Sequence, residues 1–196
     1  MITENLLKQI EFIKEIDKIK YIQRRTKLFN SDRRENDAEH SWHLAMMAII
    51  LSEYSNQEID VLKVVKMVLI HDIVEIDAGD TFIYDLNKNH DNTKEELEAA
   101  HRIFGLLPKD QAAEYIEIWN EFEEGVTAES KFARSMDRLE PLLQNTSNEG
   151  GTWKEFGVNY QTVYGKKKVI QEGATELWEY AKKLIDESVE KGILKK

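Results

Sequence analysis

Apolar residues recur every three or four positions along almost the whole chain, which is the spacing of one buried face of an α-helix. Leu6, Ile10 and Ile13 show this spacing near the N-terminus. Alternating runs of β-branched residues are lacking, whereas Glu, Lys, Leu and Ala are abundant. The sequence therefore predicts an all-α protein, a bundle of six to seven helices.

Caps and helix breakers predict where these helices begin and end. Helices are expected at about residues 3–22, 38–55, 59–76, 93–107, 110–123, from 127 onward, and 160–189. Pro141 should kink or restart the helix that begins at 127, because proline lacks the N–H of an interior helical residue. Three polar stretches are expected to be loops, namely RRTKLFNSDRRENDAEH, residues 79–92 and SNEGGTWKEFG.

Composition restricts the compartment and the class of partner. The 196 residues contain no linker or low-complexity stretch, so we expect one domain over residues 1–196. Cysteine is absent, which excludes disulfide and thiolate chemistry and fits a reducing cytosol. The net charge of −10 disfavours binding to a nucleic acid polymer. The charged N-terminus does not resemble a signal peptide, and the longest apolar run, LAMMAIIL, is too short to span a bilayer. We therefore expect a soluble, cytoplasmic protein with no membrane partner.

The stretch EIDVLKVVKMVLIHDIVEIDAGD changes character part-way along the third predicted helix. Its first half is apolar at helical spacing, but its second half holds one histidine and four carboxylates, namely His71, Asp72, Glu75, Asp77 and Asp80. Carboxylates at the C-terminal end of a helix face the negative pole of the helix dipole. A cation close to this end would offset that repulsion, and buried ionisable groups need such a partner or a metal.

Four side chains from three predicted helices form a candidate metal site: His40, His71, Asp72 and Asp137. Imidazole and carboxylate donors together suit Mn, Fe, Co, Ni or Zn. A single histidine on a helix is more often a surface group or a hydrogen-bonded core group than a metal ligand. We therefore leave out His43, His90 and His101, although His43, one turn after His40, could support the site from behind.

The same residues carry a resemblance to a known family. The pairs EH at 39–40 and HD at 71–72, followed by Asp137, resemble the H…HD…D signature of the HD-domain metal-dependent phosphohydrolases. ENDAEHSWHLA is similar to the ENxxEHSxxxA segment of the YfbR-like 5′-deoxynucleotidases, and HDIVEIDAGD to their HDxxExxxGD segment. The resemblance covers about residues 25–145 and leaves a helical extension at about 150–196.

This resemblance implies an activity and a set of roles. The family removes the 5′-phosphate of deoxyribonucleoside monophosphates with one divalent metal ion (Mn, Co, Fe, Ni, Zn or Mg). His40, His71, Asp72 and Asp137 match its metal ligands. Two acids match its catalytic groups, Glu75 and Asp80, and Arg25, fifteen residues before His40, matches its substrate-phosphate arginine. Family members are often dimers, so we expect a homodimer.

Other functions stay open on the sequence alone. A different HD chemistry would act on nucleoside triphosphates, cyclic dinucleotides or alarmones. A non-catalytic nucleotide-binding module that retains a metal is a further alternative, although it would not require Glu75 and Asp80. Phe82 or Tyr84 could contact a nucleobase or simply pack, and packing is the commonest fate of a tryptophan such as Trp153. The apolar positions of the last helix could face the bundle or a second copy of the chain.

Overall fold

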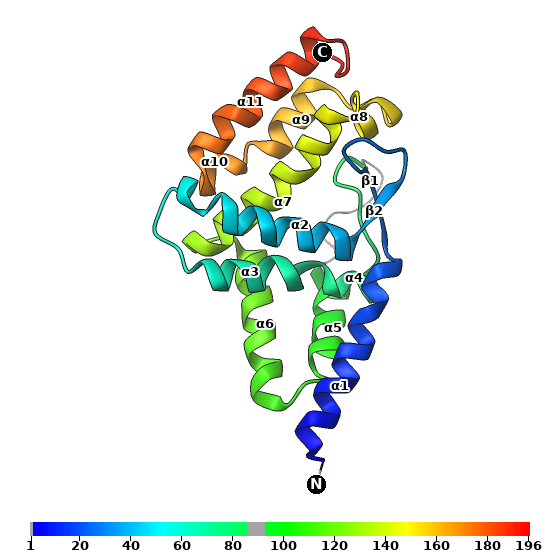
Figure 1. Cartoon of the computed structure of the whole chain (residues 1–196), viewed down its shortest axis with the longest axis vertical. Helices are drawn as coiled ribbons and strands as arrows, with labels where there is room; N and C mark the ends of the chain where they lie inside the picture. The colour runs from blue at the N-terminus through cyan, green and yellow to red at the C-terminus, as the bar shows by residue number, and fades with distance from the viewer. Residues whose placement is uncertain (1, 86–92) are drawn as a thin grey trace.

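The structure is a computed structural model that describes residues 2–85 and 93–196. It confirms the all-α prediction, because helices form most of the described chain and the one small sheet has two strands (Figure 1). The α-helices are α1 (Glu4–Ile16), α2 (Asp37–Ile50), α3 (Val61–Ile70), α4 (Glu75–Ala78), α5 (Thr93–Phe104), α6 (Lys109–Glu124), α7 (Ala128–Ser147), α8 (Gly151–Glu155), α9 (Tyr160–Lys167), α10 (Ile170–Gly173) and α11 (Thr175–Glu190). Short 3-10 helices are η1 (Asp17–Tyr21), η2 (Ser52–Tyr54) and η3 (His71–Val74). His90 and much of the predicted loop at 79–92 lie outside the described residues.

The long helix α7 holds the bundle together. It packs against α2, α3, α6 and α10, and it contributes apolar side chains such as Phe132, Met136 and Leu142 to the core. In Figure 1, α2 and α3 cross the middle of the molecule, α5 and α6 lie below them, and α9 and α11 lie above. The two ends of the chain lie at opposite ends of the long axis. None of the helices in the described ranges has the length and hydropathy that crossing a membrane requires.

The first predicted loop contains a small β-hairpin. Strands β1 (Gln23–Lys27) and β2 (Arg34–Asn36) pair antiparallel, with Gln23 opposite Asn36 and Lys27 opposite Arg34. Along β1, exposure alternates: Arg24 and Thr26 are more buried than Gln23 and Arg25. Charged residues hid this alternation in the sequence, because a strand with buried arginine does not show the usual apolar period of two.

Three other predicted boundaries differ from the structure. Helix α7 continues through Pro141 without a restart, and α8 forms inside the predicted loop at 147–157. The helix predicted at 160–189 is divided into α9, α10 and α11, with Ala174 in a non-helical conformation (φ −153°, ψ 86°). The residue before the last break packs closely on α7: a Cβ on Gly173 would lie only 2.4 Å from the Lys131 carbonyl oxygen.

The apolar side chains of the last helix pack within the same chain. Buried positions on α11 include Leu177, Trp178, Ala181 and Ile185. These residues therefore face the bundle, which was one of the two alternatives in the sequence. The homodimer stays a prediction, and this face of α11 does not provide its interface.

Candidate active site

The structure brings the four predicted metal ligands into one buried cluster. His40 comes from α2, His71 and Asp72 from η3, and Asp137 from α7. His40 Nε2 lies 3.1 Å from Asp137 Oδ1, and His71 Nε2 lies 3.0 Å from Asp72 Oδ1. Across the cluster, His71 Nε2 and Asp137 Oδ1 are 3.9 Å apart, as are His40 Nε2 and Asp72 Oδ2. Donor atoms of His40, His71 and Asp72 thus lie within 4.8 Å of one another, and Asp137 Oδ1 approaches both imidazoles.

A change of helix type presents the His71–Asp72 step to this centre. The α-helical part of the segment ends at Ile70, and residues His71–Val74 form a 3-10 turn. A 3-10 helix has about three residues per turn, so it rotates successive side chains farther than an α-helix does. The Trp119 indole Nε1 of α6 donates a hydrogen bond to the His71 carbonyl oxygen at 3.2 Å. This bond ties the turn to a neighbouring helix.

Both histidines place Nδ1 close to an oxygen atom, through a hydrogen bond in His71 and an ion-pair contact in His40, which leaves Nε2 directed at the centre. His71 Nδ1 donates to the Val68 carbonyl oxygen at 3.0 Å, and His71 Nε2 has no hydrogen-bond partner among the described residues. His40 Nδ1 lies 3.3 Å from Glu140 Oε2, and the exposed fraction of the His40 side chain is zero. Metal-binding histidines typically hold their second nitrogen in this way, with a carbonyl or a carboxylate. The donor set and its orientation therefore fit a divalent metal.

The electrostatics of the cluster favour a cation at its centre. Burial alone would lower the pKa of both histidines. Hydrogen bonding to Asp137 and Glu140 outweighs burial and raises the pKa of His40 to about 9. The charges of Asp72 and Asp137 do the same for His71 and raise its pKa to about 10. Protons held this tightly mark a strongly negative site, where a metal ion could replace them.

The acids beyond the cluster have different surroundings. Glu75 lies one turn beyond His71 and Asp72 and lines a cavity beside the cluster, as does Asp80. Burial and the charge of Asp72 raise the pKa of Glu75 well above its usual range. Asp77 instead pairs with Arg102, whose NH2 lies 2.8 Å from Asp77 Oδ1. Of the three acids after the His71–Asp72 step, the cavity thus receives Glu75 and Asp80.

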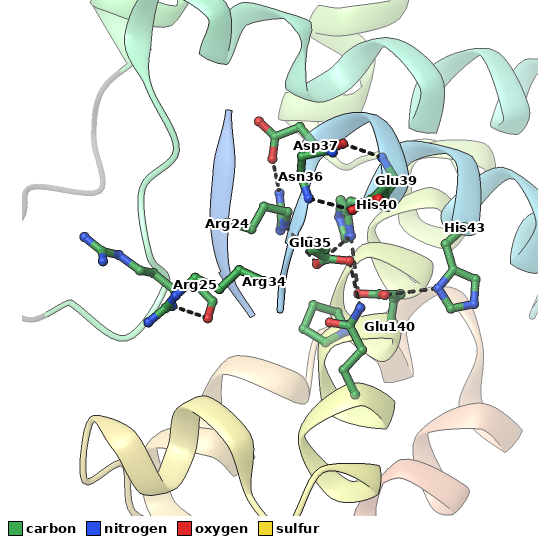
Figure 2. Close-up of polar contacts among 12 residues, drawn as sticks. Arg24, Arg25, Arg34, Glu35, Asn36, Asp37, Glu39, His40, His43 and Glu140 are labelled. Atoms are coloured by element: carbon green, nitrogen blue, oxygen red, sulfur yellow. Dashed lines mark hydrogen bonds and ion pairs between the residues drawn. The ribbon is translucent and has the colours of Figure 1, made fainter. Parts of the chain in front are cut away.

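Sequence reasoning missed Arg24, which lies in the middle of the acids. Its NH1 donates to Asp72 Oδ2 at 2.8 Å and lies 3.3 Å from Asp37 Oδ1. Its Nε lies 3.3 Å from Glu35 Oε1. Figure 2 shows Arg24 and Arg25 on the same strand with their side chains pointing in different directions. Arg25 is exposed and lines the cavity. The β1 alternation could have identified Arg24, but only once the strand itself was recognised.

Part of the ENDAEH motif acts structurally. Asn36 and Glu39 form a capping box at the start of α2, with Glu39 N donating to Asn36 Oδ1 and Asn36 N donating to Glu39 Oε2. Arg33 donates two hydrogen bonds, both of 2.9 Å, to the Glu39 carboxylate. These contacts fix the first turn of α2. His40 follows directly, so the cap positions the ligand without touching it.

The cavity beside the cluster has a volume of about 450 Å³, within the range of small-molecule sites. Its lining includes Phe82 and Tyr84, and Phe82 also packs against Phe156, with ring centroids 4.8 Å apart. Trp153 is only 1% exposed and therefore packs in the core. His101 is exposed on α5.

Glu140 should support metal binding through His40. Burial would raise the pKa of Glu140, but hydrogen bonding to His40 and His43 lowers it to about 2, so the carboxylate is ionised. His43 Nδ1 lies 3.1 Å from its other oxygen (Figure 2). We expect Glu140→Gln to weaken metal affinity by about 10- to 100-fold, the usual cost of losing such a partner. Titration against a fluorescent chelator measures this affinity, with Glu124→Gln on the surface of α6 as control. Equal affinity in the two variants would contradict the role of Glu140.

A family model described as an HD domain matches residues 16–178 of this chain. The chain belongs to the HD domain family. The resemblance in the sequence is thereby confirmed. Curated relatives carry a more specific name: the 5′-deoxynucleotidase HDDC2 of Homo sapiens is 28% identical over 141 residues, which cover 71% of this chain and 68% of that protein. The Bos taurus protein of the same name is 27% identical over 164 residues, 80% of this chain and 77% of that protein.

Solved structures extend this comparison. A protein from Magnetospirillum magnetotacticum, described as a predicted metal-dependent phosphohydrolase, is 50% identical, with a TM-score of 0.94 over 99% of this chain and 100% of that one. A conserved hypothetical protein of Pyrococcus furiosus is 23% identical, with a TM-score of 0.63 over 92% and 99% of the two chains. At that identity the likeness concerns the fold alone.

Proposed function

We propose that this HD domain protein is a metal-dependent phosphohydrolase that removes the 5′-phosphate of deoxyribonucleoside or ribonucleoside monophosphates. The observation that carries the proposal is the orientation of His40 and His71. Both present Nε2 to one buried centre beside two carboxylates and a cavity of about 450 Å³. Several curated relatives also support the proposal, because they carry the name 5′-deoxynucleotidase.

His40, His71, Asp72 and Asp137 would hold the metal. Because imidazole donors suit transition metals better than magnesium, we propose Mn, Fe, Co, Ni or Zn, with Mg as the weaker choice. When bound, such an ion polarises a phosphoryl oxygen and lowers the pKa of a coordinated water. Asp72 also accepts from Arg24, so the arginine keeps this carboxylate ionised: the charges of His71 and Arg24 outweigh burial and lower the pKa of Asp72.

The remaining residues would handle the substrate and its protons. Phosphate monoester hydrolysis needs neutralised charge, an aligned water and a proton for the leaving oxygen. Glu75, which keeps its proton above the usual pH range, is suited to protonate the leaving 5′-oxygen. Asp80 lines the same cavity and is suited to orient the water. Arg24 and Arg25 reach the cavity from β1, where a guanidinium can bind phosphate through two hydrogen bonds.

A nucleotide panel tests the proposed function directly. The purified protein is stripped of metal and then given Mn, Co, Zn or Mg with nucleoside monophosphates, triphosphates and cyclic dinucleotides. We expect phosphate release from 5′-monophosphates in the presence of a transition metal, and none from metal-stripped protein. Release from triphosphates or cyclic dinucleotides alone would instead identify another HD chemistry. Nucleotide binding without turnover under every metal would identify a non-catalytic module.

A further inference from the structure

A buried lysine lines the same cavity and has no counter-ion in the described structure. Lys167, the last residue of α9, is 1% exposed and belongs to the cavity lining. Its Nζ donates one hydrogen bond, to the Arg138 carbonyl oxygen at 2.8 Å. Within residues 2–85 and 93–196, no carboxylate oxygen lies within 4.0 Å of this ammonium group. An ammonium group has three N–H donors, so the carbonyl accounts for only one of them.

Such a lysine is costly for the fold. Taking a charge out of water without a partner carries a large penalty, and buried lysines respond by losing their proton more easily. Burial, with the charge of Arg138 added to it, lowers the pKa of Lys167 to about 7. A glutamine would satisfy the Arg138 carbonyl without this cost. The structural role alone therefore does not account for a charged residue at this position.

The surroundings of Lys167 point to an anion. Three further basic residues from α7 and α9 line the cavity, namely Arg134, Arg138 and Lys166. Arg138 pairs with Asp137, the predicted metal ligand, through Asp137 Oδ2. Each carboxylate of the metal cluster thus has a cationic neighbour. Arg24 pairs with Asp72, and Arg138 pairs with Asp137. Lys167 adjoins the second pair, because it donates to the Arg138 carbonyl oxygen.

We propose that Lys167 binds the phosphoryl oxygens of the substrate on the Asp137 side of the metal centre. This inference rests on the proposed function, because it assigns a second phosphate contact to the same site. A phosphate dianion supplies the missing counter-charge and accepts the remaining N–H donors in charge-assisted hydrogen bonds. The C-terminal helices, which follow the HD signature in the sequence, would then contribute to substrate binding.

Inorganic phosphate is the probe, because its binding does not require turnover. We expect Lys167→Met to bind phosphate about 10- to 100-fold more weakly than the wild-type protein when both are loaded with Mn, which is the usual range for losing a charge-assisted hydrogen bond. Isothermal titration measures this affinity, and elemental analysis should give equal Mn content. Lys168→Met changes the neighbouring lysine, which is exposed and outside the cavity lining, and this variant should stay within about twofold of wild type.

A second variant separates binding from folding. Lys167→Gln keeps a donor for the Arg138 carbonyl but removes the charge, and it should also bind phosphate at least about 10-fold more weakly. Both variants should melt at or above the wild-type temperature without phosphate, since an unpaired buried charge is removed. Wild-type phosphate affinity in either folded variant overturns the inference, as does a metal-loaded wild-type protein that binds no phosphate. If wild type binds phosphate through Lys167 but hydrolyses no nucleotide, the anion site stands and the proposed function fails.

Discussion

The Asp72→Ala variant should bind no stoichiometric metal and should lose at least about 10³-fold in phosphatase rate, because metal catalysis supplies several kcal/mol of transition-state stabilisation. Asp72 contacts both a histidine of the cluster and the buried Arg24. Its Oδ1 lies 3.0 Å from His71 Nε2, and its Oδ2 lies 2.8 Å from Arg24 NH1. Removing it takes away one donor and leaves the Arg24 guanidinium near the metal position without its shortest ion pair. Metal content by elemental analysis and phosphate release from a monophosphate measure the two effects.

A matched aspartate on the same segment controls for general effects of the substitution. Asp77 lies five residues farther on and pairs with Arg102 rather than with the cluster. Asp77→Ala should therefore retain metal and stay within about threefold of the wild-type rate, as surface substitutions usually do. Asp72→Asn keeps the shape of the side chain and serves where the alanine variant folds poorly. Full metal occupancy in folded Asp72→Asn and Asp72→Ala would remove Asp72 from the ligand set.

The fold class and the convergence of four side chains were both within reach of the sequence. Helical periodicity is a local property, so it survives without knowledge of tertiary contacts. The cluster could be predicted because imidazoles and carboxylates interrupt helices that are otherwise core-patterned, as His71 and Asp72 interrupt the segment after Val68. The structure places these side chains within 4 Å of their cluster neighbours, although His40 and Asp137 are 97 positions apart.

Other features depend on contacts between distant segments and were out of reach. Arg24 is more buried than Arg25 because successive side chains of a strand point to opposite faces, and β1 forms because β2 pairs with it. Glu35 looks like an ordinary acid in the sequence, but Gln144 donates to it at 2.7 Å from 109 positions away. Lys167 stands in a run of three lysines, where the sequence indicates a solvated face. The last predicted helix breaks after Gly173, and the preceding α10 packs against α7.

The Glu75→Gln variant should keep its metal and lose about 10²- to 10⁴-fold in kcat, the range that proton transfer by a positioned side chain contributes. Glu75 is not one of the four cluster donors, but its oxygen lies within 4.8 Å of oxygens of Asp72 and Asp37. Its Oε2 is buried and has no hydrogen-bond partner among the described residues. Glutamine retains the shape and removes the acidic proton. Metal affinity should therefore stay within about threefold of wild type, unlike that of a ligand variant.

The pH dependence of kcat separates a proton donor from a group that merely fills space. Burial and the charge of Asp72 raise the pKa of Glu75, so its acid form persists above the usual pH range of a glutamic acid. If that form donates the proton, kcat falls as the pH rises through this raised pKa. In Glu75→Gln this fall of kcat at high pH should be absent. Glu98 is an exposed acid of α5 that pairs with Lys94, and the pH profile of Glu98→Gln should match wild type. A Glu75→Gln enzyme with wild-type kcat and the full alkaline limb would assign proton donation to another group, and Asp80 would be the next residue to change.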